Sequence, residues 1–230
     1  MPGFELVNSK VLRVQVSRHA PVLARRGAML GYSGDVRFSP AHVGHGQGGG
    51  AGRGPGGGLG GLMAMAGRAM AGESAPLMAT EGDGEVLYGY AGLHVSLVRV
   101  DPSRPLTVEA DRLLAYDTSL SSAVLFLGQG GLRAAARGAM TGQGLFTTQL
   151  TGSGDAALLS HGGAIALQVD GGRQVTVDPQ AYVGHVGVLS VDIAASVGWR
   201  DAVGRGSGEA VQLKVSGTGT VWVQASEQKF

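Results

Sequence analysis

The chain has 230 residues, of which 43% are apolar and 15% are charged, and its formal net charge is +1. A chain of this length can bury a sizeable core, but so small a net charge argues against a broad electrostatic surface for nucleic acid or anionic membrane. Because the chain contains no cysteine, a disulfide framework, cysteine-ligated zinc and thiol chemistry are excluded.

Targeting signals are also missing from the sequence. The first ten residues lack the basic start and the apolar core of a signal peptide. No stretch approaches the roughly eighteen uninterrupted apolar residues of a membrane-spanning helix. Both observations predict a cytoplasmic protein with no membrane span.

The first predicted element is a strand at residues 12–16, where apolar and polar residues alternate. Residues 44–61 are dominated by glycine, so they predict a loop with few side chains to bury. Residues 62–70 are rich in Ala, Leu and Met and predict one short helix. Its Met63 and Met65 could contact a partner, although a plug at one end of the sheet core is the simpler role.

The rest of the chain predicts strands separated by turns. Alternation predicts strands at 95–100 and 165–170, and the dipeptides Asp101-Pro102 and Gly171-Gly172 supply the turns that follow them. Further strands are expected at 145–150, 156–160, 188–193, 211–215 and 220–224. Many short strands with regular turns and little helix predict an all-β fold, a sandwich or a barrel.

One short motif occurs three times along the chain. It consists of Gly-x-Gly followed by an apolar stretch, which we interpret as a turn that leads into a strand. The copies are Gly82–Gly84, Gly152–Gly154 and Gly217–Gly219, and Glu73, Gln143 and Glu209 precede them, each after a glycine. A period of about seventy residues indicates one small β unit. We therefore predict three β repeats, at 1–71, 72–141 and 142–230.

Two kinds of residue are candidates for interface or ligand contacts. Glu73, Gln143 and Glu209 recur at matching points and could line a shared pore or groove, or they could hold a strand start by accepting backbone N–H bonds. The second role is the simpler one. Trp199 follows a glycine in a polar segment, so it is a candidate anchor for a partner.

Enzyme and nucleotide motifs are weak or missing. G-x-G-x-x-G occurs at 52–57 and 56–61, but a glycine-rich tract produces this spacing by accident and no buried strand leads into it. No serine lies in a G-x-S-x-G elbow, and the adjacent Ser160 and His161 would point to opposite faces of a strand. The sequence predicts no catalytic residue and no cofactor.

The histidines do not form a metal-binding pattern either. A cupin-like metal site usually contains H-x-H near a glutamate, and this spacing is absent from the chain. The histidines considered are His42, His45, His94, His161 and His185. We predict no metal site, and we expect His19, His94 and His185 to be surface residues or hydrogen-bonded turn residues.

Several segments resemble the altered-inheritance-of-mitochondria family. The segments are 22–30, the glycine-rich loop closing at 72–74, 144–148 leading to 151–154, and the tail 208–214 with 217–224. The resemblance implies a TRAP-like β fold, similar to the subunit of the tryptophan RNA-binding attenuation protein. It further implies three such β-sandwich or double-stranded β-helix repeats in one chain, with three chains closing into a trimer.

Two functional classes remain open at this stage. The first is a non-enzymatic structural or assembly protein that forms a closed homo-oligomeric ring, with itself and an unknown protein as partners. The alternative is a TRAP-like module that binds RNA or a small ligand, but fold analogy supports function weakly. Arg25, Glu109 and Asp178 occupy matching positions and differ in sign, whereas RNA binding favours a repeated basic residue. We expect the first class and no enzyme.

Overall fold

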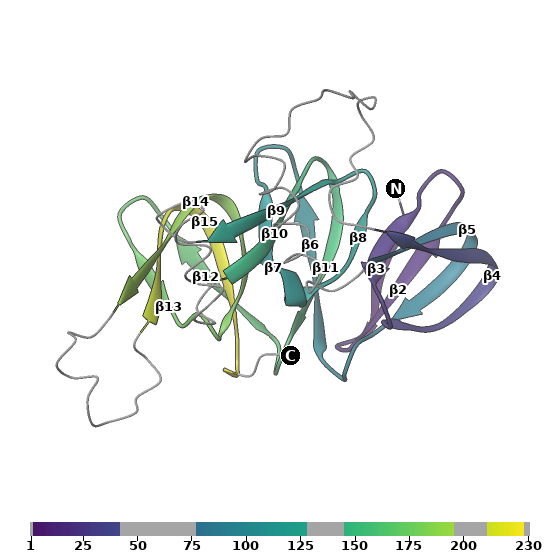
Figure 1. Cartoon of the computed structure of the whole chain (residues 1–230), viewed down its shortest axis with the longest axis horizontal. Coiled ribbons are helices and arrows are strands. Elements are labelled where there is room, and N and C mark those ends of the chain that lie inside the picture. Colours follow the sequence, from purple (N-terminus) through teal and green to yellow (C-terminus); the bar gives the residue numbers. More distant parts are fainter. Residues whose placement is uncertain (1, 42–76, 128–144, 196–210, 228–230) are drawn as a thin grey trace, which may run out of the picture.

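The architecture consists almost entirely of β-strands, as predicted from the sequence. The structure is a computed structural model, and it describes residues 2–41, 77–127, 145–195 and 211–227. These residues form fifteen strands, β1 to β15, and one single-turn 3-10 helix, η1 (Figure 1). The predicted glycine-rich loop at 44–61 and the predicted helix at 62–70 lie outside the described residues.

The strands fall into three groups along the chain. The first group comprises β1 (Gly3–Asn8), β2 (Val11–Val16), β3 (Val22–Arg25), β4 (Met29–Ala41) and β5 (Leu77–Tyr88). The second comprises β6 (His94–Val100), β7 (Leu106–Glu109), η1 (Ala110–Arg112), β8 (Leu113–Asp117), β9 (Ser121–Leu127), β10 (Leu145–Thr151) and β11 (Gly154–Ser160). The third comprises β12 (Ala164–Val169), β13 (Val175–Val177), β14 (Tyr182–Ala195) and β15 (Val211–Gln224).

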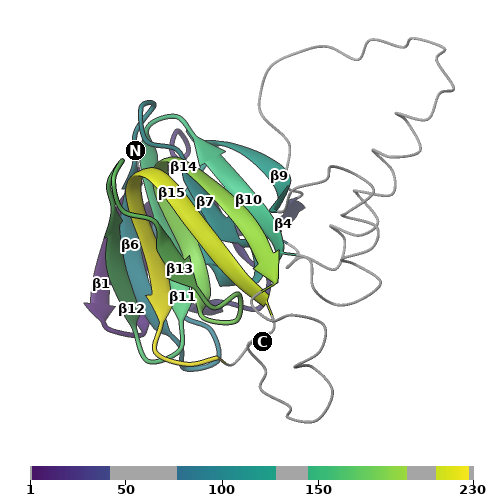
Figure 2. The ribbon, with the colours of Figure 1, turned by 90° about the vertical axis from the view of Figure 1, so that its left-hand side faces the viewer.

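Two antiparallel sheets contain all of these strands. In the first sheet the order is β1-β2-β5-β3-β8-β11-β6, and β4 also pairs with β5. In the second the order is β12-β15-β14-β7-β10-β9, and β13 also pairs with β15. The strands of the second group are therefore divided between the two sheets: β6, β8 and β11 belong to the first, and β7, β9 and β10 belong to the second. This group lies between the other two groups along the long axis of the molecule (Figure 1). Figure 2, viewed along that axis, shows the long strands crossing the molecule at a slant.

Most predicted strands are confirmed. The alternating segments at 12–16 and 95–100 lie within β2 and β6, and the segment at 165–170 corresponds to β12. The predicted turns after β6 and β12 are closed by isolated bridges from Asp101 to Arg104 and from Asp170 to Arg173. A third bridge joins Ser17 to Ala20 after β2.

The interpretation of Gly-x-Gly as a turn was wrong in two of its three copies. Gly82 lies inside β5 and Gly217 lies inside β15, so the predicted strands 211–215 and 220–224 are one strand. At Gly82, Gly152 and Gly217 the φ angles are 115°, 114° and 116°, a region that favours glycine. A Cβ at Gly82 or Gly217 would also overlap the carbonyl oxygen of the facing strand. The motif marks a close approach of two backbones within a long hairpin.

Three apolar clusters fill the interior, one for each group of strands. The first contains Val14, Val22 and Val86, the second contains Val108 and Leu158, and the third is built around Val215 and Val221. Neighbouring groups share their cores, because Leu77 of β5 and Val183 of β14 pack in the second cluster. Apolar packing thus continues from one group to the next.

Short strands join the groups at two junctions. At the first, β3 pairs with β8, with Leu23 opposite Tyr116. At the second, β7 pairs with β14, with Thr107 opposite His185. Each of β8 and β14 also pairs on its other edge with a strand of its own group, so both edges are hydrogen-bonded there.

Candidate functional site

The contact residues predicted from the sequence lie outside the described part of the chain. These residues are Glu73, Gln143, Glu209, Trp199, Met63 and Met65. Their roles as pore, groove or partner contacts stay predictions.

Titratable side chains do not gather into a metal site in the described ranges. No group of three His, Asp or Glu residues there is close enough to hold a metal ion. His42 and His45 fall outside these ranges. His161 follows β11, and its backbone N–H donates to Gln224 Oε1 at 3.0 Å.

His185 is a strand residue, so the expectation of a surface or turn position was wrong. Its ring lies in β14 with 5% exposure, and its Nδ1 is 2.7 Å from the hydroxyl of Tyr182. Burial lowers the pKa of His185 to about 4 and raises the pKa of Tyr182 well above its usual value. Both groups are therefore neutral at pH 7, and together they satisfy each other's polar atoms inside the sheet.

A buried ion pair lies at the start of η1. Arg112 Nε is 3.3 Å from Glu109 Oε2, and the Arg112 side chain is almost fully buried. Burial lowers the pKa of Arg112, whereas the Glu109 carboxylate opposes that shift. Glu109 also raises the pKa of Tyr182, so the polar cluster of Glu109, Arg112, Tyr182 and His185 spans the second and third groups of strands.

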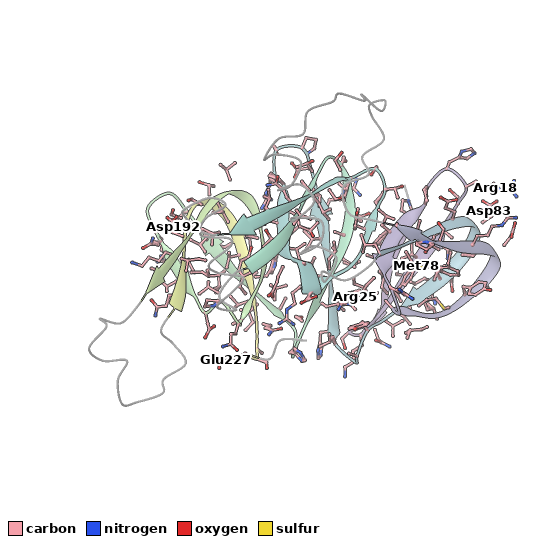
Figure 3. All side chains as sticks on the ribbon, viewed as in Figure 1. Arg18, Arg25, Met78, Asp83, Asp192 and Glu227 are labelled. Carbon is pink, nitrogen blue, oxygen red and sulfur yellow. The ribbon has the colours of Figure 1, made fainter. Side chains whose placement is uncertain are left out.

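Arg25 closes the other junction. Its Nη1 donates to the carbonyl oxygen of Asp111 at 3.0 Å and lies 3.8 Å from the Asp111 carboxylate. Its guanidinium also stacks over the ring of Tyr90 at 4.3 Å. Figure 3 shows Arg25 between the first and second groups of strands. Arg25 therefore links the first group of strands to the second.

A cleft of about 770 Å³ lies beside the first junction. Its polar lining includes Arg18, Asp117 and Ser119. Arg18 Nε is 2.8 Å from Asp83, and Asp117 Oδ1 accepts the backbone N–H of Ser119 at 2.9 Å. Figure 3 shows Arg18 and Asp83 together at one end of the molecule. Arg18 and Asp117 are thus engaged in a surface pair and a turn, and the lining also contains His19 and Glu81.

The open edge of β4 is the most unusual surface of the described residues. Met29, Leu30 and Tyr32 on this edge are 43%, 58% and 54% exposed. At the first junction, the corresponding residues of β8, which are Leu113, Leu114 and Tyr116, are 2%, 0% and 0% exposed. In β14 the corresponding Tyr182, Val183 and His185 are also buried. Clustered apolar side chains beside unpaired backbone groups are typical of an interaction surface.

The correspondence of β4, β8 and β14 follows from their pairing. Each strand has a register shift at the same point against its partner, between Met29 and Gly31, between Leu113 and Ala115, and between Tyr182 and Gly184. The apolar start of each strand is visible in the sequence as Met-Leu-Gly-Tyr, Leu-Leu-Ala-Tyr and Tyr-Val-Gly-His. This similarity could have revealed the correspondence of the three strand starts, but not which of them is uncovered.

Another strand with an unpaired edge, β13, lies at the opposite end of the molecule. Among the described strands, β4 pairs with β5 alone and β13 pairs with β15 alone, and the strands at the ends of the two sheets, β1, β6, β9 and β12, also pair on one side only. β3 and β7 are mostly buried because they pair on both sides, whereas Val175 of β13 is half-buried and Thr176 is exposed. β4 and β13 lie at opposite ends of the row of strand groups in Figure 1. We call these two strands the open edges.

Within the described residues, no helix has the length and apolar character needed to cross a membrane.

Comparisons with known proteins place the chain in a family. No curated protein matches the chain. The structure is similar to the crystal structure of protein SPYM3_0169 from Streptococcus pyogenes, with a TM-score of 0.68 and 19% identity, covering 98% of this chain and 93% of that one. At this identity the similarity shows the fold alone.

The sequence profile of the family described as mitochondrial biogenesis AIM24 matches residues 4–226. This match covers nearly the whole chain, and it confirms the resemblance drawn from the sequence motifs. The protein belongs to the AIM24 family.

Proposed function

We propose that this chain is a non-enzymatic structural protein that assembles with copies of itself, through its open edges, into a closed homo-oligomeric ring. The observation that carries the proposal is the contrast in burial between β4 and β8. The same apolar strand start is covered by a neighbouring strand in the middle of the chain and is uncovered at Met29, Leu30 and Tyr32. A second copy is the simplest source of the missing cover.

The proposal rests on three related β units. We define unit 1 as residues 3–88, unit 2 as 94–160 and unit 3 as 164–224. These bounds differ from the predicted repeats at 1–71, 72–141 and 142–230, because they follow the short connections between the strand groups. In each unit the carboxyl-terminal strands pair with the strand that precedes the short strand, which gives the pairs β2–β5, β6–β11 and β12–β15. They also pair with the short strand itself, which gives β3–β5, β7–β10 and β13–β15. Unit 1 has one additional strand at its start, β1, which pairs with β2.

The units also share their turns. The isolated bridges at Ser17–Ala20, Asp101–Arg104 and Asp170–Arg173 each lie directly before the short strand of a unit. The positive φ values at Gly82, Gly152 and Gly217 each occur two residues after the residue that pairs with the start of the short strand. This agreement in pairing and backbone supports an internal repeat.

Assembly through β4 and β13 is head-to-tail, because the two edges differ. A head-to-tail contact closes into a ring when its rotation brings the last copy to the first, and it otherwise gives an open filament. We propose closure with three chains, as the family resemblance implies. Closure covers the unpaired edges of β4 and β13, which are two of the edges available for uncontrolled edge-to-edge pairing.

The alternative role in RNA binding gains little support from the matching positions Arg25, Glu109 and Asp178. Arg25 and Glu109 are buried, and Asp178 is acidic and caps a turn by accepting the N–H of Gln180 at 2.7 Å. RNA binding along a repeated surface would require exposed basic or stacking groups at these points. They are therefore poor candidates for nucleic-acid contacts.

The proposed assembly is tested by the mass of the purified chain in solution. Light scattering and native mass spectrometry over a hundredfold range of concentration should show one discrete species of three chains. A chain that stays at 23.2 kDa throughout would overturn the proposal. A mass that grows with concentration without limit would keep the self-association but overturn the closed ring.

A further inference from the structure

The two junctions inside the chain have the same register. At the first, Val22, Leu23 and Ala24 of β3 lie opposite Asp117, Tyr116 and Ala115 of β8. At the second, Leu106, Thr107 and Val108 of β7 lie opposite Val186, His185 and Gly184 of β14. Both are antiparallel, and both begin directly after the register shift in the longer strand. The short strand of one unit therefore pairs with the next unit according to a fixed rule.

The same rule can be applied to the open edges. On β4 the register shift lies between Met29 and Gly31, which aligns Gly31 with Ala115 and Gly184. On β13, the residue that begins the pairing with β15 is Val175, which aligns with Val22 of β3 and Leu106 of β7. The rule therefore places Val175 opposite Ser33, Thr176 opposite Tyr32, and Val177 opposite Gly31.

These residues cannot meet within one chain. β13 and β4 lie at opposite ends of the row of strand groups, with unit 2 between them (Figure 1). The rule can be satisfied only between two copies. The pairing would cover Tyr32 as β3 covers Tyr116 at the first junction, where the tyrosine is fully buried.

Charge also favours this contact. Inside the chain, Arg25 at the end of β3 pairs with Asp111 in the connection that precedes β8. The matching residue at the end of β13 is Asp178, and the connection before β4 contains Arg26, which lies one position before the residue that aligns with Asp111. Arg26 is exposed, and Asp178 is half-buried. The signs are reversed but complementary, so the edge of one copy should attract the edge of another.

We propose that β13 of one copy adds to β4 of the next as an antiparallel strand, with Val175 opposite Ser33 and Asp178 beside Arg26. This inference rests on the proposed self-assembly and specifies its contact. It commits to a second copy of this chain as the occupant of the apolar edge at Met29, Leu30 and Tyr32.

Disulfide cross-linking tests the register directly, because the chain contains no native cysteine. Gly187 N–H donates to Pro105 O at 3.2 Å, so the adjacent pair of Leu106 and Val186 lacks mutual hydrogen bonds. In the proposed contact, Val175 and Ser33 occupy the positions of Leu106 and Val186, so they would also form a pair without mutual hydrogen bonds. In such a pair the Cα atoms lie about 4.5 Å apart, within the range that a disulfide spans.

The experiment mixes two single-cysteine chains, Ser33→Cys and Val175→Cys, under mild oxidation. We expect a covalent dimer on a non-reducing gel, and neither variant alone should give that product efficiently. The matched control mixes Arg37→Cys with Val175→Cys, because Arg37 lies on the same strand four residues away. That mixture should cross-link at least about tenfold more slowly, since the cysteines would be more than one strand spacing apart.

The outcomes separate the register from the assembly itself. If the native chain is oligomeric but the Ser33 mixture cross-links no faster than the Arg37 mixture, the register is overturned and self-assembly stands. If the native chain is monomeric at every concentration, the proposed function and the register fail together. Cross-linking of Val175→Cys to a site within its own chain would also overturn the register.

A charge exchange provides a second readout that needs no oxidation. Asp178→Arg and Arg26→Asp should each raise the concentration at which the oligomer dissociates, by about five- to tenfold for one lost ion pair. The combined variant should recover most of the native value, because the pair is restored with exchanged signs. If the effects of the two single changes on the dissociation concentration simply add in the combined variant, Asp178 and Arg26 do not face each other.

Discussion

The hydroxyl of Tyr182 lies 2.7 Å from Nδ1 of His185, and both rings are buried in β14 at the junction with β7. The pair has no exposed edge from which to bind a substrate. The pair affects the stability of the fold, because a buried neutral histidine resists protonation.

Acidification should destabilise the fold through His185. The pKa is about 4 in the folded chain and 6.5 in the unfolded chain, so the unfolded state binds the proton more tightly. The contribution of His185 is therefore complete above pH 6.5 and is lost as the pH falls towards 4. The full shift corresponds to about 3 kcal/mol. Urea unfolding of the native chain and of His185→Gln between pH 7 and pH 4.5 should show a smaller pH dependence in the variant.

His19→Gln is the matched control, because His19 is exposed on a turn. It should leave the pH dependence of unfolding unchanged. An equal slope for His185→Gln and the native chain would contradict the burial of a neutral imidazole.

Removal of Arg112 should leave a buried carboxylate at Glu109. Arg112→Met is expected to lower the free energy of unfolding by about 3–5 kcal/mol, the usual cost of breaking a buried pair. Arg112→Met combined with Glu109→Leu should recover much of that loss, since no charge stays buried. Arg18→Met, which removes an exposed pair with Asp83, should cost no more than about 1 kcal/mol. A similar loss for Arg18→Met and Arg112→Met would show that burial does not strengthen the coupling.

Gly217 should not tolerate a side chain. Its φ is 116°, and a Cβ would overlap the carbonyl oxygen of Val188 on β14. Gly217→Ala is expected to cost at least about 1–3 kcal/mol, because the backbone must shift or remain strained. Gly171→Ala is the control, since the space around Gly171 is open and its φ is not positive. Thermal unfolding of both variants measures the difference, and equal melting temperatures would refute a steric role for Gly217.

A charge on the open edge of β4 should disrupt assembly while sparing the fold. Tyr32→Lys is expected to shift the solution mass towards that of one chain, because the lysine would lie between two paired strands. Val188→Lys is the control, because Val188 is 75% exposed and lies outside both open edges. Circular dichroism should show native β content in both variants. Unchanged mass for Tyr32→Lys would indicate that β4 is not an assembly surface.

The strand content and the positions of most strands along the chain were accessible from the sequence. Alternation at residues 12–16 and 95–100 identified β2 and β6 because one face of each strand is buried. The Gly-x-Gly motif was found, but its meaning was misread, since glycine marks either a turn or a close approach of backbones. Local sequence cannot distinguish the two, because the difference depends on which strand lies opposite.

The residues predicted as contacts were chosen from repeated or conspicuous side chains, and all of them lie outside the described ranges. The open edges were not identified, although the apolar start of β4 has the same character as that of β8. Composition and periodicity show that Tyr32 and Tyr116 occur in similar strands. Each tyrosine pairs on one side with a strand of its own group, β11 for Tyr116 and β5 for Tyr32. Burial depends on the neighbour on the other side, which is β3 for Tyr116 and no described strand for Tyr32.

Membership of the family and the all-β character of the chain follow from local patterns of residue type, because alternation and glycine position depend on a few neighbouring residues. The location of the uncovered surface follows from long-range pairing, because a strand edge is open only when every other strand of the chain has been placed. For this protein, the apolar strand starts are written in the sequence, and their exposure at one end is a property of the assembled sheets.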